Sequence, residues 1–396
     1  MQARPYWPGH YQPHLPGELG FYDLRLPEVR AAQARLARTY GIDGFCYYHY
    51  WFHGRRVLDR PLREVLTTGR PDFPFCVLWA NEPWTRVWDG GADRILIDQQ
   101  YSLDDDREHI RYLIEAFADS RYIRREGRPV LGVYRIQALP EPRRTVELWR
   151  KECADAGVGD PFILKFDTYH NADDPAQYGC DAAAEFVPHL LSPQVPSVVP
   201  PGANPRNLVL RYADASRAYQ GRHSESWVRY PGVLPSWDNS PRHSDGRAIA
   251  LIDSTPGEFE RWLRAAIARA QREDPASPFV FVNAWNVWAE GAHLEPDLRF
   301  GRQYLEAIAR ATGRRVEAPQ ADGEPVPDPA DPADLYADLY ERYVRLQREH
   351  SALVAVMERR IASTVAEHEA RLRVAREQAR ALAEWAHTLR ARGLKP

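Results

Sequence analysis

Short apolar runs alternate with segments of helical period along the first 316 residues. The apolar runs are rich in β-branched and aromatic residues and are apolar at nearly every position, which is typical of strands buried on both faces of a sheet. Seven such strands are predicted over residues 44–50, 74–80, 130–135, 162–166, 182–187, 232–237 and 278–284. Apolar residues that recur every three or four positions predict six helices over residues 27–40, 58–68, 104–119, 143–156, 256–272 and 300–311.

The alternation of strands and helices predicts a parallel sheet covered by helices on both faces. Both a (β/α)8 barrel and an open doubly wound sheet have this pattern. No glycine-rich phosphate-binding loop follows the early strands, which favours the barrel. A barrel needs eight strands, and the first predicted helix, at residues 27–40, has no strand before it. We therefore expect an α/β fold in the form of a TIM-like barrel that lacks its first strand.

The composition changes near residue 316. Residues 317–334 are rich in proline and acidic residues and are predicted to form a linker between the barrel domain, residues 1–316, and the rest of the chain. Residues 335–396 are rich in Ala, Arg, Glu and Leu, with apolar positions spaced by three, four and seven. This spacing predicts a long amphipathic helix, with an imperfect heptad that is compatible with a coiled coil. At about 1.5 Å per residue the helix is too long to fold back as one core helix, so we expect it to self-associate, to dock on the barrel or to lead to another domain.

Composition and charge exclude several classes of function. The 52 basic and 55 acidic residues leave a net charge of −3, which provides no electrostatic footprint for nucleic acid. No apolar run approaches the roughly 20 residues of a membrane span, and the first residues lack the order of a signal peptide. The four cysteines form no CxxC pair and are interpreted as reduced thiols rather than a disulfide or metal site. We therefore expect a cytoplasmic protein with no nucleic-acid partner and no membrane span.

The aromatic residues indicate a ligand. The chain has 12 Trp and 20 Tyr, and many of them fall in short clusters. Core packing alone is one interpretation, since aromatic side chains bury large areas. However, these clusters are interleaved with His, Asn, Asp and Glu, which a dry core does not tolerate unpaired. Flat aromatic faces beside amides and carboxylates suit a sugar, so we expect an oligosaccharide or polysaccharide ligand.

The candidate binding residues follow the predicted strands. In a parallel barrel the active site lies at the carboxyl ends of the strands, and six of the predicted strands end in polar or aromatic groups rather than in the Lys, Glu and Ser of an ordinary solvated rim. The candidate substrate-binding residues are Tyr48, His49, Trp51, Asn81, Trp84, Trp237, Asp238, Asn239, Arg242, Asn286, Trp288 and His293.

Carboxylates beside tryptophans suggest glycosidic chemistry, in which one group protonates the leaving oxygen and another supports the sugar cation or acts as a base. Glu82, Asp238 and Glu290 stand at strand ends in this way. Apolar surroundings raise the pKa of a carboxyl group, and Glu290, which follows Trp288, fits an acid/base role. The alternative for each of them is a salt-bridged rim residue. The histidines are scattered without metal-ligand spacing, so no metal and no other cofactor is predicted.

Five blocks of the sequence together resemble the WbsX domain, a glycoside hydrolase family 99-like group of bacterial polysaccharide biosynthesis proteins. They lie within roughly residues 8–312 and read GHYQPHLPGELGFYDLRLPEV, YGIDGFCYYHYWFHGRRVLDRPL, FPFCVLWANEPWTRVWDG, PGVLPSWDNSPR and FVNAWNVWAEGAHLEPDLRFGRQYLEAI. The resemblance implies a (β/α)8 barrel that acts on cell-surface polysaccharide of the O-antigen or lipopolysaccharide type. Family 99 itself contains retaining endo-α-mannosidases, thought to work through a 1,2-anhydro sugar with one Glu as base on the 2-hydroxyl and another as acid/base.

Two departures from the family pattern bear on activity. A block expected to read Trp-Asn-Glu-Trp-x-Glu-Gly retains its second carboxylate as Glu290, but Val287 replaces the first. An aliphatic side chain cannot accept a proton, so Glu82 is the candidate substitute for the missing base. The family also opens with a strand, a Pro-Gln-Phe-His-type segment and a Trp-rich stretch. This chain begins after that point, in agreement with the missing first strand.

Two functions from different classes follow. The first is a glycosidase or transglycosylase of the endo-α-mannosidase type, acting on α-linked glycans with Glu290 and Glu82 as its catalytic residues. The second is a catalytically impaired glycan-binding or scaffold module. A nucleotide-sugar glycosyltransferase is less favoured, because no DxD motif follows a strand and residues 104–106 (Asp-Asp-Asp) open a predicted helix. Through its C-terminal helix the protein is expected to form a homo-oligomer or to join a fused or partner glycosyltransferase.

Overall fold

The computed structural model describes residues 3–85, 95–189, 191, 195–222 and 226–316, and the structural statements below refer to these residues. The chain divides into two compact units, Met1–Glu317 and Ala318–Pro396. The predicted linker at 317–334 and the predicted helix at 335–396 lie outside the described residues. The fold described here is therefore that of the first unit.

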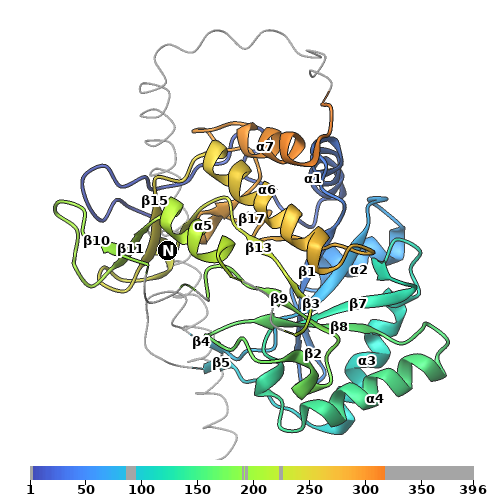
Figure 1. Ribbon diagram of the computed structural model, residues 1–396. Helices are drawn as coiled ribbons and strands as arrows, with labels where there is room; N and C mark the ends of the chain where they lie inside the picture. Colours follow the sequence, from blue (N-terminus) through green and yellow to red (C-terminus); the bar gives the residue numbers. More distant parts are fainter. Residues whose placement is uncertain (1–2, 86–94, 190, 192–194, 223–225, 317–396) are drawn as a thin grey trace, which may run out of the picture. The chain divides into compact units, whose positions relative to one another are not determined.

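A mostly parallel sheet forms the centre of this unit (Figure 1). Its strands follow the order β12-β9-β8-β7-β3-β1, and every neighbouring pair in this order is parallel. Strand β13 begins two residues after β12 ends and pairs in parallel with β16, which extends the series by one strand. The strands are β1 (Phe45–Phe52), β3 (Phe75–Trp79), β7 (Arg128–Val133), β8 (Phe162–Asp167), β9 (Ala182–Glu185), β12 (Arg229–Tyr230), β13 (Gly232–Val233) and β16 (Phe281–Val282).

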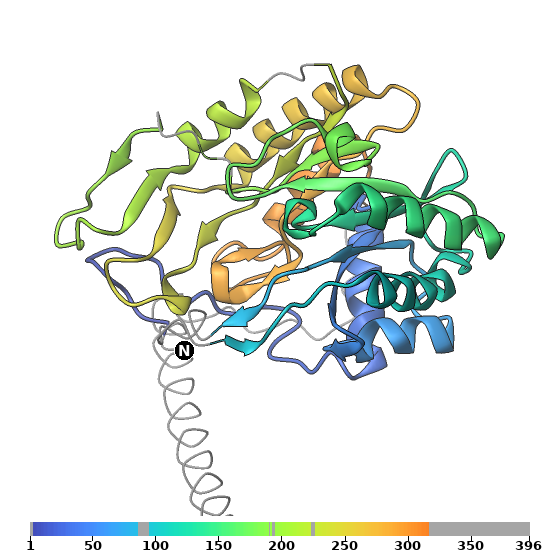
Figure 2. The ribbon, with the colours of Figure 1, turned by 90° about the horizontal axis from the view of Figure 1, so that it is seen from below.

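Helices cover the sheet in two groups (Figures 1 and 2). One apolar cluster joins β3, β7, β8 and β9 to α2, α3 and α4, and a second joins α1, α5, α6 and α7 to β13 and its neighbours. All six predicted helices are present. A seventh helix, α5, lies in the long connection between β9 and β12, for which no helix was predicted. The helices are α1 (Pro27–Tyr40), α2 (Arg60–Thr68), α3 (Leu103–Phe117), α4 (Pro142–Asp155), α5 (Tyr212–Gln220), α6 (Pro256–Glu273) and α7 (Gln303–Thr312).

Local sequence signals set the helix ends. Helix α1 has Pro27 in its first turn and ends at Gly41, whose φ of +89° is a left-handed conformation that favours glycine. Helix α3 begins after Ser102, whose hydroxyl accepts a hydrogen bond from the Asp105 backbone N–H. The acidic residues 104–106 occupy the first turn of α3, where negative charge is favourable. Their interpretation as helix-opening charges is confirmed.

The predicted strand at residues 232–237 is wrong at its C-terminal end. Only Gly232 and Val233 join the parallel series, whereas Trp237 and Asp238 form β14 (Trp237–Asp238) of a separate four-stranded sheet. Hydrogen bonding explains the difference, because β14 pairs antiparallel with β15 (Ile249–Ile252) instead of continuing beside β16. The rest of this small sheet consists of β10 (Ser197–Val198) and β11 (Leu208–Arg211).

The remaining strands are short and form antiparallel pairs. Strand β2 (Arg55–Val57) pairs antiparallel with the end of β1, and β6 (Arg124–Arg125) pairs with the start of β7. Two further hairpins join β4 (Trp84–Thr85) to β5 (Ile95–Ile97) and β17 (Asn286–Val287) to β18 (Ala292–His293). Both of these hairpins follow strands of the main sheet and extend the edge where the candidate site lies.

No strand precedes α1 in the described residues, as the sequence predicts, and these residues contain no pairing between β1 and β16. Strands β1 and β16 are also less buried than β3. Phe45, Cys46 and Tyr47 of β1 and both residues of β16 are half-buried, whereas all five residues of β3 are buried. The fold is thus α/β with a mostly parallel sheet. Within the described residues, the strand pairings do not close this sheet into a barrel.

Two composition-based expectations can be compared with the structure. All four cysteines are free, with Cys76, Cys153 and Cys180 buried and Cys46 half-buried, in agreement with their interpretation as thiols. Among the described helices, none has both the length and the apolar character that crossing a membrane would require.

Candidate active site

Two carboxylates from separate segments lie close enough to a tyrosine of β1 for their charges to act on it. Tyr48 lies in β1, Glu82 follows β3, and Glu290 ends the single-turn helix η5 (Trp288–Glu290). Burial raises the pKa of Tyr48 well above its ordinary value, and the negative charges of Glu290 and Glu82 both raise it further. Yet 37% of the Tyr48 surface is accessible to solvent. Tyr48 is thus accessible to solvent and lies within reach of the charges of both carboxylates.

Glu290 occupies an environment suited to an acid. Its side chain is 14% exposed, and one carboxylate oxygen lies 3.1 Å from Nε of Arg242. Burial raises the pKa of Glu290 above its ordinary value, and the guanidinium of Arg242 offsets part of that rise. Glu290 and Arg242 are both residues that the sequence predicted for the site. A carboxyl group with a raised pKa holds its proton closer to neutral pH and can donate it.

Glu82 is held in a charged network with Arg135 and Tyr169. Its Oε1 accepts a hydrogen bond from Nη1 of Arg135 at 2.8 Å, and its Oε2 accepts one from the Tyr169 hydroxyl at 3.2 Å. Asn81 fixes this corner, since its amide bonds both the backbone N–H and the carbonyl of Arg135, at 2.7 and 2.8 Å. Asn81 is buried and therefore positions the corner rather than facing a ligand.

Aromatic rings surround the carboxylates. Trp84 packs edge-on against Tyr50, with ring centroids 5.2 Å apart, and the pKa of Tyr50 responds to the charges of Arg242 and Glu290. Near Glu82, Tyr134 packs against Tyr169 and both rings contact His189. Sequence reasoning did not select Tyr50, Tyr134, Tyr169, His189 or Arg135 for the site, although all of them lie within or just after predicted strands.

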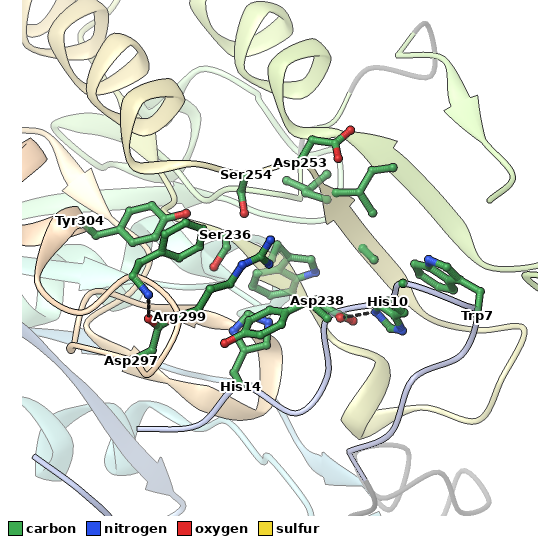
Figure 3. A pocket seen from close by; sticks show the side chains of 17 residues that line it. Trp7, His10, His14, Ser236, Asp238, Asp253, Ser254, Asp297, Arg299 and Tyr304 are labelled. Carbon is green, nitrogen blue, oxygen red and sulfur yellow. Dashed lines mark hydrogen bonds and ion pairs between the residues drawn. The ribbon is translucent and has the colours of Figure 1, made fainter. Parts of the chain in front are cut away.

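A second polar cluster lines a small cavity of about 140 Å³ (Figure 3). Asp238 lies at its centre, and Oδ2 accepts hydrogen bonds from His10 Nε2 at 2.6 Å and from Gln12 Nε2 at 2.7 Å. Burial works to raise the pKa of Asp238, but these hydrogen bonds outweigh burial and hold the pKa below its ordinary value. Trp237 lines the same cavity and is almost fully buried. These contacts favour the ionised form of Asp238.

The loop that carries Glu290 packs closely against two residues that line this cavity, Asp238 and His14. Gly291 follows Glu290 with φ +60°, and a Cβ there would lie 3.2 Å from both the Asp238 backbone nitrogen and the His14 ring. His10, Gln12 and His14 come from the N-terminal segment before α1. Sequence reasoning missed all three, because this segment has no periodicity that predicts where it lies.

His49 and Trp51 do not reach the site. Successive side chains of a strand point to opposite faces, so these two residues of β1 point away from Tyr48 and toward α3. His49 Nε2 lies 3.0 Å from His109 Nε2, and the Trp51 indole donates a hydrogen bond to Asp105 at 2.9 Å. Both side chains are buried in the layer between sheet and helices. Their prediction as substrate-binding residues is therefore corrected to a packing role.

A buried carboxylate organises the loop before Glu290. Glu295 accepts hydrogen bonds from the indoles of Trp285 and Trp288, both at 2.9 Å, from Gln33 at 2.7 Å and from Tyr22 at 2.8 Å. Burial raises the pKa of Glu295, and these hydrogen bonds lower it in part. Sequence reasoning did not single out Glu295, although a Glu two residues after His293 in an aromatic block was available as a signal.

Four further predicted residues make internal contacts. The amide of Asn286 donates a hydrogen bond to the Tyr22 hydroxyl at 3.0 Å, and Asn239 accepts one from the Ile249 backbone at 2.7 Å. Trp288 stacks on His293, with ring centroids 3.9 Å apart. His293 is also one of three buried or half-buried groups, with His14 and Asp297, whose ligand atoms lie within 4.8 Å of one another. Among the described residues, these three are the ones that could hold a metal ion.

The comparisons with known proteins agree with this architecture. The family described as "Glycosyltransferase WbsX" matches residues 1–308. The chain belongs to the WbsX family. It is also 40% identical over 313 residues to a protein from each of two strains of Xanthomonas campestris pv. campestris, both described as "Uncharacterized protein WxcX". The match covers 78% of this chain and 45% of each relative, so the chain spans less than half the length of these relatives.

Solved structures support the fold. A protein described as "Glycoside hydrolase-like protein" is 14% identical, with a TM-score of 0.51 over 76% of this chain and 89% of the other. The GH99 endo-alpha-mannosidase of Bacteroides thetaiotaomicron, in complex with bis-tris-propane, is also 14% identical, with a TM-score of 0.50 over 76% of this chain and 87% of the other. At this identity the likeness concerns the fold.

Proposed function

We propose that this WbsX-family protein cleaves or transfers α-linked glycans at the carboxyl edge of its sheet, with Glu290 as the acid/base. The observation that carries the proposal is the placement of Glu290 and Glu82 near the accessible Tyr48 ring. Two carboxylates from different strand ends, one of them with a raised pKa, are the groups that glycosidic bond cleavage requires. The likeness to family 99 endo-α-mannosidases makes a mannose-type glycan of cell-surface polysaccharide the first substrate to test, in a cytoplasmic protein.

The roles of the remaining groups follow from their charge and position. Glu290 donates a proton to the leaving oxygen, and Arg242 keeps it close to ionisation so that it can later accept one. Glu82 accepts a hydrogen bond from Arg135 and is the candidate for the base or the cation-stabilising group. Tyr48, Tyr50 and Trp84 offer the aromatic faces on which a sugar ring can stack. Trp237 and Asp238 extend the site toward the cavity of about 140 Å³ that they line.

A glycan-binding module without turnover is the second candidate function, and one residue favours it. Val287 replaces the carboxylate that family 99 uses on the 2-hydroxyl, and it packs with the apolar cluster around α6 and α7. Transfer rather than hydrolysis is a variant of the first function. The word "glycosyltransferase" in the family description favours it, and the same acid/base would serve a sugar acceptor in place of water.

The test combines binding and turnover. A panel of mannose-containing oligosaccharides and an activated aryl α-mannoside would be titrated against tryptophan fluorescence, and the products would be analysed by mass spectrometry. We expect binding with slow cleavage, and longer products if the protein transfers. Glu290→Gln should bind sugar but lose turnover by at least about 10²-fold. Glu152→Gln is the matched control, because Glu152 also pairs with arginines, Arg107 and Arg111, but on the outer helix α4.

Each outcome decides between the candidates. Binding without turnover in both the parent and Glu290→Gln would leave the binding module as the function. Turnover that survives Glu290→Gln would remove Glu290 from the acid/base role. If no sugar of the panel changes the tryptophan fluorescence, the glycan-site proposal is overturned as a whole.

A further inference from the structure

His14, His293 and Asp297 form a compact cluster beside the second cavity, outside the proposed acid/base pair. His14 Nδ1 lies 2.9 Å from His293 Nε2, and Asp297 Oδ2 lies 3.9 Å from the same His293 atom. His293 and Asp297 are 2% and 4% exposed. Figure 3 shows His14 and Asp297 among the residues that line the cavity. The cluster is thus buried on one side and reachable from the cavity on the other.

We propose that this cluster binds one divalent transition-metal ion, Zn²⁺ being the ion to test, through His14 Nδ1, His293 Nε2 and Asp297 Oδ2. Two imidazole nitrogens and one carboxylate oxygen are ligands that Zn²⁺ accepts, whereas Mg²⁺ and Ca²⁺ prefer oxygen alone. Three protein ligands leave the fourth position of a tetrahedral ion open to the cavity. The proposal does not depend on the proposed glycan function.

The hydrogen bonds around His293 prepare its Nε2 as a ligand. Its Nδ1 lies 3.2 Å from the carbonyl oxygen of Glu295. A carbonyl can only accept, so the proton of the neutral ring is on Nδ1 and the lone pair of Nε2 faces His14. A metal-bound histidine usually has its second nitrogen held by a carbonyl or carboxylate in this way. The stacked Trp288 ring fixes the plane of the imidazole.

The other two ligands are positioned by backbone contacts. The Gly17 N–H donates to the Pro296 carbonyl at 2.8 Å and the Leu298 N–H to the Leu15 carbonyl at 3.1 Å, which fastens the His14 segment to the Asp297 segment. Asp297 Oδ1 accepts a hydrogen bond from the Phe300 backbone, so that Oδ2 is the oxygen turned toward His293. The metal would clamp two segments that are already paired.

Two of the three ligand pairs require only small movements, and the ligand atoms of the third pair, His14 and Asp297, lie within 4.8 Å of each other. Two nitrogens bound to one tetrahedral Zn²⁺ at about 2.0–2.1 Å stand about 3.3 Å apart. The histidine nitrogens at 2.9 Å would separate by about 0.4 Å, and the Asp297 oxygen would approach by about 0.6 Å. In the unbound protein the proton on His14 Nδ1 fills the space between the two rings. On metal binding it moves to His14 Nε2 by tautomer exchange, and the metal takes its place.

Nearby charges both favour and oppose a cation. Arg299 lies close enough to act on both His14 and Asp297 and opposes the metal. Its guanidinium rests over the rings of Tyr11 and Phe300, with centroid distances of 4.3 and 4.9 Å. Asp238 also acts on His14, but its Oδ2 is already hydrogen-bonded to His10, which acts on His14 in the same direction as Arg299. The carboxylate of Asp297 is therefore the charge within the cluster that favours a cation.

The test measures Zn²⁺ binding to the full chain. Metal-free protein would compete with a chromophoric zinc chelator, and thermal unfolding would be followed with and without Zn²⁺. We expect one ion per chain and a Zn²⁺-dependent rise in melting temperature, because a ligand that binds only the folded state stabilises it. His14→Gln and Asp297→Asn should each weaken binding by at least about 10-fold. His170→Asn is the matched control, since His170 is exposed and Asn tolerates its positive φ of 65°.

A spectroscopic measurement covers the case in which a variant fails to fold. Co²⁺ added to the unaltered chain should give the visible bands of a four- or five-coordinate site with nitrogen and oxygen ligands. A strong near-ultraviolet thiolate band would place the ion on cysteine and overturn the assignment. Absence of stoichiometric binding to the unaltered chain, or equal affinity in a folded His14→Gln, would reduce the cluster to a structural His–His hydrogen bond.

Discussion

At the residue scale, the ionisation of Glu290 depends on two opposing influences. Burial raises its pKa, and Arg242, 3.1 Å away, lowers it. A general acid must carry its proton, so an activity that relies on Glu290 is lost as the pH rises through its pKa. Glu290 is therefore expected to stay competent to higher pH than an exposed glutamate.

Replacing Arg242 isolates the second influence. Arg242→Gln removes the positive charge, so the pKa of Glu290 should rise further and the falling limb of the pH–rate profile should move to higher pH. The measurement is the pH dependence of kcat/KM on an aryl α-mannoside. Arg247→Gln, at an exposed position of the same segment, serves as control. A falling limb that is identical in Arg242→Gln and in the parent would show that another group donates the proton.

Val287 tests whether the site lacks a base. Val287→Glu places a carboxylate on β17, one residue before Trp288, where desolvation tends to raise its pKa. A correctly placed general base contributes about 10²–10⁴-fold, so any residual glycosidase rate should rise by about that factor. The rate is measured on the activated α-mannoside. A folded, sugar-binding Val287→Glu that stays as slow as the parent would favour the binding module.

At the element scale, the loop between β16 and α7 depends on Glu295. Glu295→Gln keeps the volume but offers one carbonyl oxygen to four donors and turns an amide N–H₂ toward them. At least two of these donors, of which Gln33 is buried and the other three are half-buried, then lose their partner, at about 1–3 kcal/mol each. The free energy of unfolding in urea should fall by about 2–5 kcal/mol, with a change in tryptophan fluorescence.

The control for Glu295→Gln is the same substitution at a nearby glutamate that is exposed. Glu306 on α7 is 48% exposed, and its oxygen lies 4.0 Å from Arg310. Glu306→Gln should change the free energy of unfolding by less than about 0.5 kcal/mol. Equal, small effects of both variants would mean that the loop does not rely on the Glu295 carboxylate.

At the scale of the whole molecule, the C-terminal segment remains a prediction from the sequence. Its apolar positions, among them Leu346 and Leu353, form one stripe on the expected helix. An amphipathic helix of this length without a core to cover pairs with another helix. Deletion of residues 330–396 should therefore reduce the number of subunits measured by sedimentation equilibrium.

Point variants separate helix pairing from simple loss of mass. Leu346→Glu combined with Leu353→Glu places charge in the stripe and should also dissociate the assembly. Gln347→Glu combined with Ala352→Glu, outside the stripe, should leave it intact. If the deleted chain keeps the same number of subunits, self-association does not depend on this helix.

The sequence by itself determined the elements and the edge where they meet. Periodicity is a local property, so the strands around Cys46 and Cys76 and all six predicted helices could be recognised without tertiary information. Parallel strands also bring their carboxyl ends to one edge, which is why Tyr48, Glu82 and Glu290 could be predicted to lie near one another.

Only the tertiary structure decided which face of each strand and which sheet a residue belongs to. Alternation along β1 separates Tyr48 from His49, but the packing of α3 determines which of the two is covered. Asp238 belongs to a different sheet, because its strand, β14, pairs antiparallel with β15. His10 and His14 lie in a segment without periodicity, so their places depend on contacts with residues more than 220 positions away. Such long-range contacts have no local signal in the sequence, because they are made only after the chain has folded.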